Sequence, residues 1–290
     1  MKLGCQSSLV SYADAAAPDQ DKVLLRLKEA HRLGLVNVSD PLQRWQDPGY
    51  LRWIAEQAAQ LGITLDSGWS DCWASPDPTQ LKPLQEFSSK LEAVTSHLGS
   101  RVFSLVVTDC DRFFKNPPLD EQLALIAERL QPLADLAAKA GVSLALENHA
   151  DYRGSELVRI FKQVGRRSLG CRLDTGNPFI MGEDPVDAAQ VLAPYTYDVH
   201  LKDMWVGLGR HWHLQQKYPV PSQVGAPLGQ GDVDLPAIME ILANKAPSPA
   251  DLCLNIEIDW LPKEIDLRVA AEDSIRYCRE KFGRYLTTKE

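Results

Sequence analysis

Four acidic or imidazole side chains close four apolar segments of the sequence. Glu147 ends "LALE", Asp174 ends "CRLD", His200 ends "YDVH" and Glu257 ends "LNIE". Any one of them is also explained as a polar residue that closes a layer of side chains. Three carboxylates brought together would repel and raise one another's pKa, and a cation between them removes that cost. The four residues therefore predict a metal site.

Three carboxylates and one imidazole form a mixed set of oxygen and nitrogen ligands. Hard oxygen ligands favour Mg²⁺ or Mn²⁺, and the imidazole favours Mn²⁺, Co²⁺ or another transition metal. The absence of a thiolate from the set argues against a tetrahedral structural zinc site. We expect a divalent cofactor, Mn²⁺ first and Mg²⁺, Co²⁺ or Zn²⁺ as alternatives, with coordination positions left for substrate oxygens.

These residues need elements that bring them to one place, and the sequence alternates between two patterns. Apolar or β-branched runs predict strands, and segments with 3.6-residue periodicity predict helices. The strands are expected at 2–10, 34–40, 62–68, 101–107, 141–149, 169–175, 197–203 and 251–259, and the helices at 19–35, 49–62, 80–98, 119–141, 154–165, 184–194, 234–245 and 266–282. Gly34, Gly62 and Gly141 each stand between a helix and the next strand, as helix-ending glycines do.

Eight strand–helix units in 290 residues predict one domain, residues 1–290, with the α/β fold of a single (β/α)8 TIM barrel. A doubly wound open sheet is the alternative, but no glycine-rich fingerprint follows the first strand. In a barrel, the loops after the strands form the face where active sites lie. The longest irregular segments, 66–80, 108–118 and 203–233, all follow strands and are expected on that face.

Composition limits the partners. The net charge of −8 argues against binding to nucleic acid or to an anionic membrane. No segment approaches the roughly 20 apolar residues that span a bilayer, and the first residues lack the apolar run of a signal peptide. The six cysteines are scattered without a CxxC pair, which favours reduced thiols. We expect a cytoplasmic protein that acts on a small polar substrate.

Five motifs in order carry a more specific resemblance. They are "LALENH", "LDTGN", "VHLKD", "GQGDVDL" at 229–235 and "NIEID", and together they cover roughly residues 140–260. Each motif alone is weak, but the ordered set resembles the xylose isomerase-like TIM-barrel superfamily, in the sugar phosphate isomerase/epimerase group. The eight-unit pattern extends the resemblance over the whole chain.

The resemblance implies roles for individual residues. Glu147, Asp174, His200 and Glu257 match the metal ligands of the family. Glu147 and Glu257 match the glutamates that flank the substrate, where one removes a proton next to a carbonyl and the other returns it, through an enediolate. The implied activity is a metal-dependent isomerase or epimerase of a sugar, keto-sugar or inosose. Its partner is a small carbohydrate, and a homo-oligomer is left open because such barrels often dimerise.

Further residues are expected to contact the substrate. His149 and Lys202 lie two residues beyond Glu147 and His200, so both should point into the barrel mouth. For Lys202, a salt bridge with a neighbouring carboxylate is an equal alternative. In the long loop after the seventh strand, the ring of Trp205 suits a sugar face, and Arg210 suits a carboxylate or phosphate. His211 and His213 of that loop are a weaker candidate for a second metal site.

Two residues near Asp174 refine the hypothesis. Many epimerases of the group have a histidine three residues after this aspartate, where the chain has Asn177, which hydrogen-bonds a hydroxyl but does not titrate. Asn177 favours the alternative activity, a dehydratase acting on an inosose or dehydroshikimate, which shares the first proton transfer. Arg172 should lie one layer deeper on the inward face, where it offsets the carboxylates and orients a ligand.

Two other classes fit less well. An endonuclease IV-like enzyme of the same superfamily needs a trinuclear zinc site with several more histidines than this site offers, and the chain has six in all. A non-catalytic barrel would be expected to lack one of the metal ligands, and all four are present. The sequence therefore favours a metal-dependent sugar enzyme.

Overall fold

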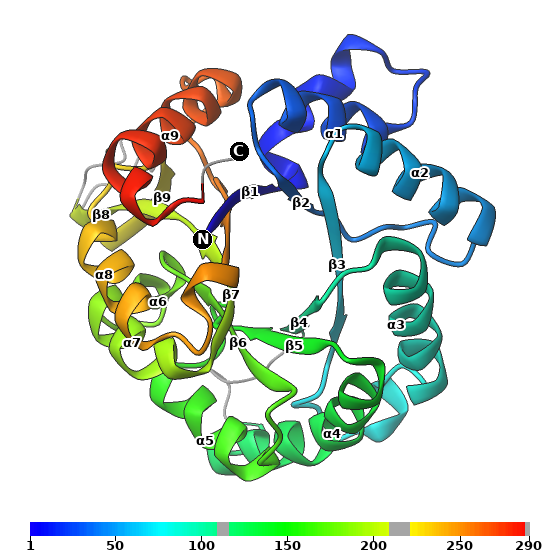
Figure 1. Ribbon diagram of the computed structural model, residues 1–290. Helices are drawn as coiled ribbons and strands as arrows, with labels where there is room; N and C mark the ends of the chain where they lie inside the picture. Colours follow the sequence, from blue (N-terminus) through cyan, green and yellow to red (C-terminus); the bar gives the residue numbers. More distant parts are fainter. Residues whose placement is uncertain (109–115, 209–220, 288–290) are drawn as a thin grey trace.

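The computed structural model, which describes residues 1–108, 116–208 and 221–287, contains a closed barrel of eight parallel strands (Figure 1). Around the barrel the order is β1-β10-β7-β6-β5-β4-β3-β2. The barrel strands are β1 Lys2–Gln6, β2 Asn37–Ser39, β3 Thr64–Asp71, β4 Val102–Val107, β5 Ser143–Glu147, β6 Leu169–Asp174, β7 Thr196–Leu201 and β10 Cys253–Ile256. The prediction of a TIM barrel is confirmed.

Helices surround the barrel (Figure 1). Buried apolar residues of the strands and of the helices form one hydrophobic core. They are α1 Lys22–Arg32, α2 Pro48–Gln60, α3 Leu84–Leu98, α4 Leu119–Ala140, α5 Gly154–Val164, α6 Asn177–Ile180, α7 Pro185–Leu192, α8 Leu235–Lys245 and α9 Leu267–Phe282, with 3-10 helices at Ser7–Ala16, Pro78–Gln80, Ala193–Tyr195, Pro249–Asp251 and Gly283–Tyr285. No helix within the described ranges is long and apolar enough to cross a membrane.

The helix ends follow the local sequence. Gly34, Gly62 and Gly141 have φ values of 68°, 64° and 69°, the left-handed conformation that ends a helix without a Cβ penalty, as predicted. At the other end, aspartate side chains accept backbone N–H groups of the first turn of several helices. These N-cap residues are Asp21, Asp47, Asp184, Asp234 and Asp266.

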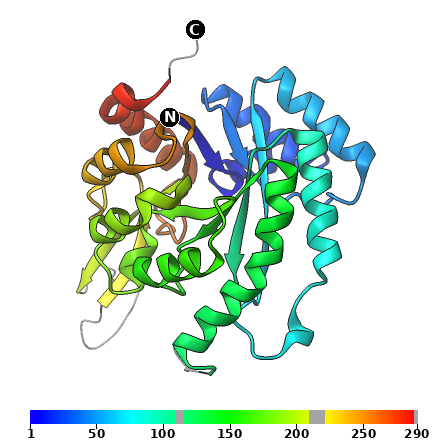
Figure 2. The ribbon, with the colours of Figure 1, turned by 60° about the horizontal axis from the view of Figure 1, so that its bottom comes forward.

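Three segments differ from the expectation. The segment 66–80 was expected to be irregular, but β3 continues to Asp71. The first strand was expected over residues 2–10 but ends at Gln6, and the chain continues as a 3-10 helix. The segment 203–233 was expected to be irregular, but β8 Asp203–Leu208 and β9 Pro221–Ala226 pair there as an antiparallel ribbon. Figure 2 shows this ribbon at the end of the barrel opposite the two termini. The two strands are not joined by a short turn motif, so the sequence gives no sign that they pair.

Polar side chains fill one layer inside the barrel. Arg172 Nε donates to Asp198 Oδ2 at 2.6 Å, and Asn255 Nδ2 donates to the other oxygen of Asp198 at 3.1 Å. Asn37 Nδ2 then donates to Asn255 Oδ1 at 3.0 Å and to Asp66 Oδ2 at 2.8 Å. All five residues are buried, and we call them the inner polar network. A hydrogen-bonded partner for each charged group makes this layer compatible with burial.

Candidate metal centre

Glu147, Asp174, His200 and Glu257 meet at the carboxyl ends of four adjacent strands, β5, β6, β7 and β10. One ligand atom of each lies within 4.8 Å of the others, and all four side chains are buried. His200 occupies the middle, because its Nδ1 is 3.4 Å from Glu147 Oε2 and 3.4 Å from Glu257 Oε2. We call these four residues the acidic cluster, and the structure brings together the set that the sequence predicted.

The acidic cluster contains buried polar atoms that make no hydrogen bond. Both ring nitrogens of His200 are in this state, whereas Oδ2 of Asp174 and Oε2 of Glu257 are ion-paired with the ammonium of Lys202. Burial of such atoms without a partner is costly, so native structures rarely tolerate several in one place. A divalent cation would satisfy them, because carboxylate oxygens and a neutral imidazole nitrogen are its ordinary ligands. The residues therefore fit a metal.

The turn after β6 fixes the orientation of Asp174. The backbone N–H groups of Gly176 and Asn177 donate to Asp174 Oδ1, each at 2.8 Å. Asn148 holds the backbone of the same residue, donating to its carbonyl at 2.8 Å and accepting from its N–H at 2.7 Å. Oδ1 is thereby engaged, and Oδ2 is the oxygen left facing the acidic cluster. Asn148 was not among the predicted site residues, because strand alternation gives no sign that its side chain bridges two strands.

Lys202 supplies a positive charge at the acidic cluster. Its ammonium lies 2.7 Å from Glu257 Oε2, 3.0 Å from Asp174 Oδ2 and 3.1 Å from Asp259 Oδ2. Burial raises the pKa of Asp174 above its ordinary value. Burial acts in the same direction on Glu257, but the charges of His200 and Lys202 outweigh it and hold the pKa of Glu257 well below its usual range. The salt-bridge alternative for Lys202 is thus present in the structure.

Asn177 and Arg172 lie on two sides of the acidic cluster. Asn177 is buried, donates to Glu147 Oε1 at 3.3 Å and accepts from Lys202 Nζ at 3.3 Å. Arg172 lies one layer deeper, as expected, but its hydrogen bonds go to Asp198 and to Ser39. Within the described part of the chain, it donates to no residue of the acidic cluster. It therefore acts on the cluster through charge and not by holding a ligand.

The remaining candidates either contact other partners or lie outside the described residues. The side chain of His149 is 48% exposed and pairs with Asp151 at 3.2 Å, a hydrogen bond that raises the pKa of His149 to about 9. Trp205, on β8, donates its indole N–H to the carbonyl of Gln230 at 2.6 Å. Arg210, like His211 and His213, lies outside the described residues.

The structure explains why two of the sequence motifs occur together. Asp203, the last residue of "VHLKD", is buried and accepts four backbone N–H groups. The donors, Met204, Gly229, Gly231 and Val233, lie at 2.8–3.1 Å, and three of them belong to the segment "GQGDVDL". A Cβ on Gly231 would lie 2.1 Å from the carboxylate of Asp203, so glycine is required there. Asp203 therefore folds the loop that follows β9 and has an architectural role.

Trp260 is a second residue that sequence analysis did not identify. It lies three residues after Glu257 in the sequence and is 59% exposed. The centre of its ring lies 5.7 Å from Lys202 Nζ. Its φ of 52° is uncommon for a residue with a large side chain. Such strain is often found at functional sites, so Trp260 joins the candidates at the barrel mouth.

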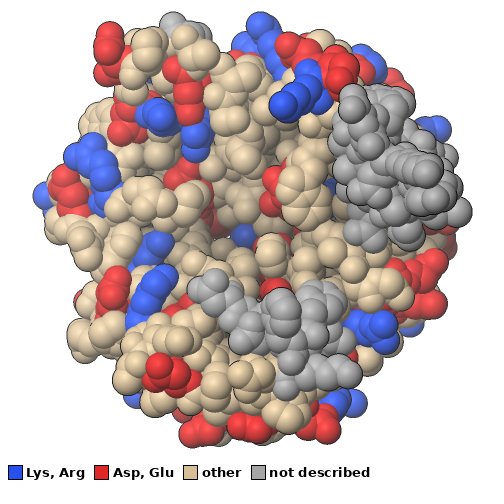
Figure 3. Space-filling view, turned by 180° about the vertical axis from the view of Figure 1, so that it is seen from behind, with Lys and Arg blue, Asp and Glu red and all other residues tan. Residues whose placement is uncertain are grey.

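The face of the molecule at the carboxyl ends of the strands is hollowed at its centre, and both basic and acidic side chains are visible in the hollow (Figure 3). The family model of the xylose isomerase-like TIM barrel matches residues 27–281. The chain belongs to this family. The match covers all four residues of the acidic cluster and most of the barrel.

Individual relatives of this xylose isomerase-like chain are distant. The uncharacterized protein YihM of Escherichia coli K12 is 26% identical over 150 residues, which are 49% of this chain and only 42% of that relative. An inosose dehydratase of Geobacillus thermodenitrificans NG80-2 is 23% identical over 205 residues, 65% of this chain and 68% of the dehydratase. The solved D-psicose 3-epimerase of Clostridium cellulolyticum H10 superposes with a TM-score of 0.73 at 15% identity, covering 99% of this chain and 100% of the epimerase.

Proposed function

We propose that this protein is a divalent-metal-dependent sugar isomerase or epimerase that moves a proton next to a carbonyl group. The observation that carries the proposal is the acidic cluster, whose four ligand atoms lie within 4.8 Å of one another in a buried position at the barrel mouth. Membership of the xylose isomerase-like family and the likeness to a sugar epimerase support a keto-sugar or inosose as the substrate.

Glu147, Asp174, His200 and Glu257 would hold the metal, and Mn²⁺ is the first candidate from the mixed donor set. When bound, the metal supplies positive charge that polarises the substrate carbonyl and stabilises negative charge on its oxygen. Mg²⁺, Co²⁺ and Zn²⁺ stay as alternatives, because carboxylates and an imidazole accept each of them.

Glu147 and Glu257 are the proposed proton carriers. They stand on β5 and directly after β10, with β6 and β7 between them, and His200 Nδ1 is 3.4 Å from an oxygen of each. A substrate between them would present opposite faces to the two carboxylates. One removes the proton from the carbon next to the carbonyl, and the other returns it from the opposite face.

Neighbouring side chains are proposed to bind the hydroxyl groups of the substrate. Asn177 and Lys202 are the strongest candidates, since both are buried beside the acidic cluster and contact Glu147 and Glu257, respectively. Trp260 adds an exposed aromatic face at the same mouth, suited to the apolar face of a sugar. His149 is a further candidate through its Nε2, because the contact with Asp151 uses only Nδ1. For Trp205 and Arg210, substrate binding stays a prediction.

The test uses the metal-loaded enzyme with ketohexoses and inososes in D₂O. Incorporation of deuterium into product of otherwise unchanged composition supports the isomerase or epimerase. The parallel variant Glu257→Gln should lose the exchange while remaining folded. Exchange by Glu257→Gln at the wild-type rate contradicts the assignment of Glu257.

The second candidate is a dehydratase of a cyclic polyol ketone, of the inosose or dehydroshikimate type. The observation in its favour is the 23% identity to an inosose dehydratase over 65% of this chain. The first proton transfer is the same, but the resulting enolate expels a hydroxyl group. Loss of water from the product in the same D₂O experiment would select this activity over the first.

A further inference from the structure

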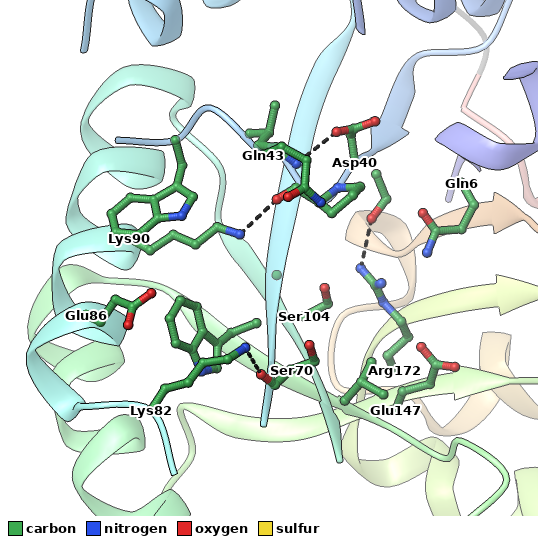
Figure 4. Close-up of a pocket in the computed structure, with 17 residues that line it drawn as sticks. Gln6, Asp40, Gln43, Ser70, Lys82, Glu86, Lys90, Ser104, Glu147 and Arg172 are labelled. Atoms are coloured by element: carbon green, nitrogen blue, oxygen red, sulfur yellow. Dashed lines mark hydrogen bonds between the residues drawn. The ribbon is translucent and has the colours of Figure 1, made fainter. Parts of the chain in front are cut away.

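A cavity of about 430 Å³ extends from the acidic cluster across the mouth of the barrel. Glu147 and Arg172 line it on one side, and Lys82 and Lys90 line the other side, against α3 (Figure 4). The volume lies in the range of small-molecule sites. A substrate that reaches Glu147 with its reacting carbon therefore has room to extend toward the two lysines.

Lys90 is a buried cation in this cavity. Its side chain lies on α3, the residue is 6% exposed, and its ammonium donates to the carbonyl of Pro41 at 2.8 Å. The ring centre of Trp69 lies 5.9 Å away. In the described part of the chain, no carboxylate oxygen lies within 4.0 Å of this ammonium. A buried lysine without a counter-ion is costly, and burial followed by the charge of Lys82 lowers the pKa of Lys90 to about 8.

Lys82 places a second ammonium at the same end of the cavity. It donates to the carbonyl of Ser70 at 2.7 Å and lies 4.6 Å from the centre of the same Trp69 ring. It also has no carboxylate oxygen within 4.0 Å among the described residues. Each ammonium carries three N–H groups, so both retain donors for a further acceptor.

The acids that line the cavity form no ion pair with the two lysines, although the charges of Asp40 and Glu86 oppose part of the lowering of the Lys90 pKa. Asp40 accepts the backbone N–H of Leu42 at 2.8 Å and lies 3.5 Å from Arg26. Glu86 is partly exposed, and its carboxylate stays beyond 4.0 Å from both lysines. Glu147 belongs to the acidic cluster on the other side of the cavity. The lysine end is thus a cationic pocket with an aromatic wall.

We propose that Lys82 and Lys90 bind an anionic group, a phosphate or a carboxylate, carried by the sugar substrate at the end distant from the reacting carbon. This inference rests on the proposed function and specifies its substrate class. An anion between the two ammonium groups would supply the counter-ion that Lys90 lacks and would set the direction in which the sugar enters the cavity. Charge-assisted hydrogen bonds of this kind correspond to about 10- to 100-fold in affinity per lysine.

The test compares three substrates with the metal-loaded enzyme: a neutral ketohexose, its 6-phosphate, and a keto-aldonate of the same length. The rate of deuterium exchange gives kcat/KM for each. We expect one charged substrate to exceed the neutral one by at least about 10-fold, and its identity tells phosphate from carboxylate. Lys82→Met and Lys90→Met should each remove that advantage and leave exchange of the neutral ketohexose unchanged. Lys162→Met, a matched loss of charge at an exposed position of α5, should change nothing.

A second readout does not depend on turnover. Titration calorimetry of the metal-loaded enzyme with inorganic phosphate should show binding that weakens about 10-fold or more in Lys82→Met and Lys90→Met, but not in Lys162→Met. If this holds while no sugar exchanges deuterium, the proposed function fails and the anion site stands. Equal rates for neutral and charged substrates, with unchanged phosphate binding in both variants, would overturn the inference. An equal loss for all three substrates in Lys90→Met alone would also overturn it, because it would assign Lys90 to holding Pro41.

Discussion

Two polar layers lie inside the same barrel, one directly above the other, and they differ in how well their atoms are satisfied. Arg172, Asp198 and Asn255 of the inner polar network each precede a member of the acidic cluster by two residues, so each pair shares a strand and a face. In the inner network, every charged group has a hydrogen-bonded partner. In the acidic cluster, both ring nitrogens of His200 make no hydrogen bond, and Lys202 is the cation that pairs with Oδ2 of Asp174 and Oε2 of Glu257.

The difference separates a structural role from a functional one. A buried polar layer whose charged groups are hydrogen-bonded to one another adds specificity to the fold. A buried layer of carboxylates and an imidazole gains stability from a cation, and Lys202 provides part of that charge. The inner polar network thus supports the barrel, and the acidic cluster is the layer equipped to act on a ligand.

The largest effect is expected from removing one charge of the acidic cluster. Glu257→Gln should lower the rate of deuterium exchange about 10²- to 10⁴-fold, because the carboxamide cannot accept a proton. Cooperative thermal unfolding should remain, since the carboxamide keeps the size of the side chain and Lys202 retains Asp174 and Asp259 as ion-pair partners. Exchange kinetics measure the loss of activity, and thermal unfolding measures whether the fold is retained. Loss of stability together with a normal rate of exchange would contradict the prediction, because it would give Glu257 a structural role like that of the inner polar network.

The opposite pattern is expected in the inner polar network. Asp198→Ala should lower the free energy of unfolding by about 3–5 kcal/mol, because the guanidinium of Arg172 stays buried without its partner. Denaturant unfolding measures this loss. The control is Asp135→Ala, which breaks an Arg–Asp pair of similar length on the surface, with Arg166, and should have little effect. Equal stability of the two variants would contradict the role of the inner network.

The inner polar network also contains one carboxyl group, that of Asp66, whose pKa is raised. Burial, followed by the charge of Asp198, raises the pKa of Asp66 to about 6 from 3.8. The folded state therefore binds this proton more tightly than the unfolded state, and stability falls as the pH rises from about 4 to about 6, by up to about 3 kcal/mol. Asp66→Asn should flatten that part of the pH profile of unfolding. An unchanged profile in the variant would assign the pH dependence to other groups.

The smallest effect on stability is expected from metal binding, and it should depend on the acidic cluster and not on the inner polar network. The metal-loaded wild type should be more stable than the chelator-treated protein, by about 2.7 kcal/mol at a metal concentration 100 times Kd. Asp174→Asn should lose most of this difference, while Asp66→Asn should keep it. Thermal unfolding with and without chelator measures both. A stably metal-free protein with full activity would refute the metal site.

The sequence was sufficient to predict the barrel and the members of the acidic cluster. Periodicity is a local property, and strand ends can be found within a few residues, so Glu147, Asp174, His200 and Glu257 could be recognised one strand at a time. Parallel strands of a closed barrel then bring their carboxyl ends to one face, and the prediction needed no side-chain detail.

Only the tertiary structure decided how each side chain is used. Sequence alternation pointed both His149 and Lys202 inward, yet His149 pairs with Asp151 on the surface and Lys202 enters the acidic cluster. Arg172 donates to Asp198, which is 26 residues away along the chain. Lys90 lines the cavity, although the sequence pattern of its helix predicts only an amphipathic helix and no site residue. The physical reason is that hydrogen bonds and ion pairs form between neighbours in space, and for these residues the neighbours lie on other strands and loops.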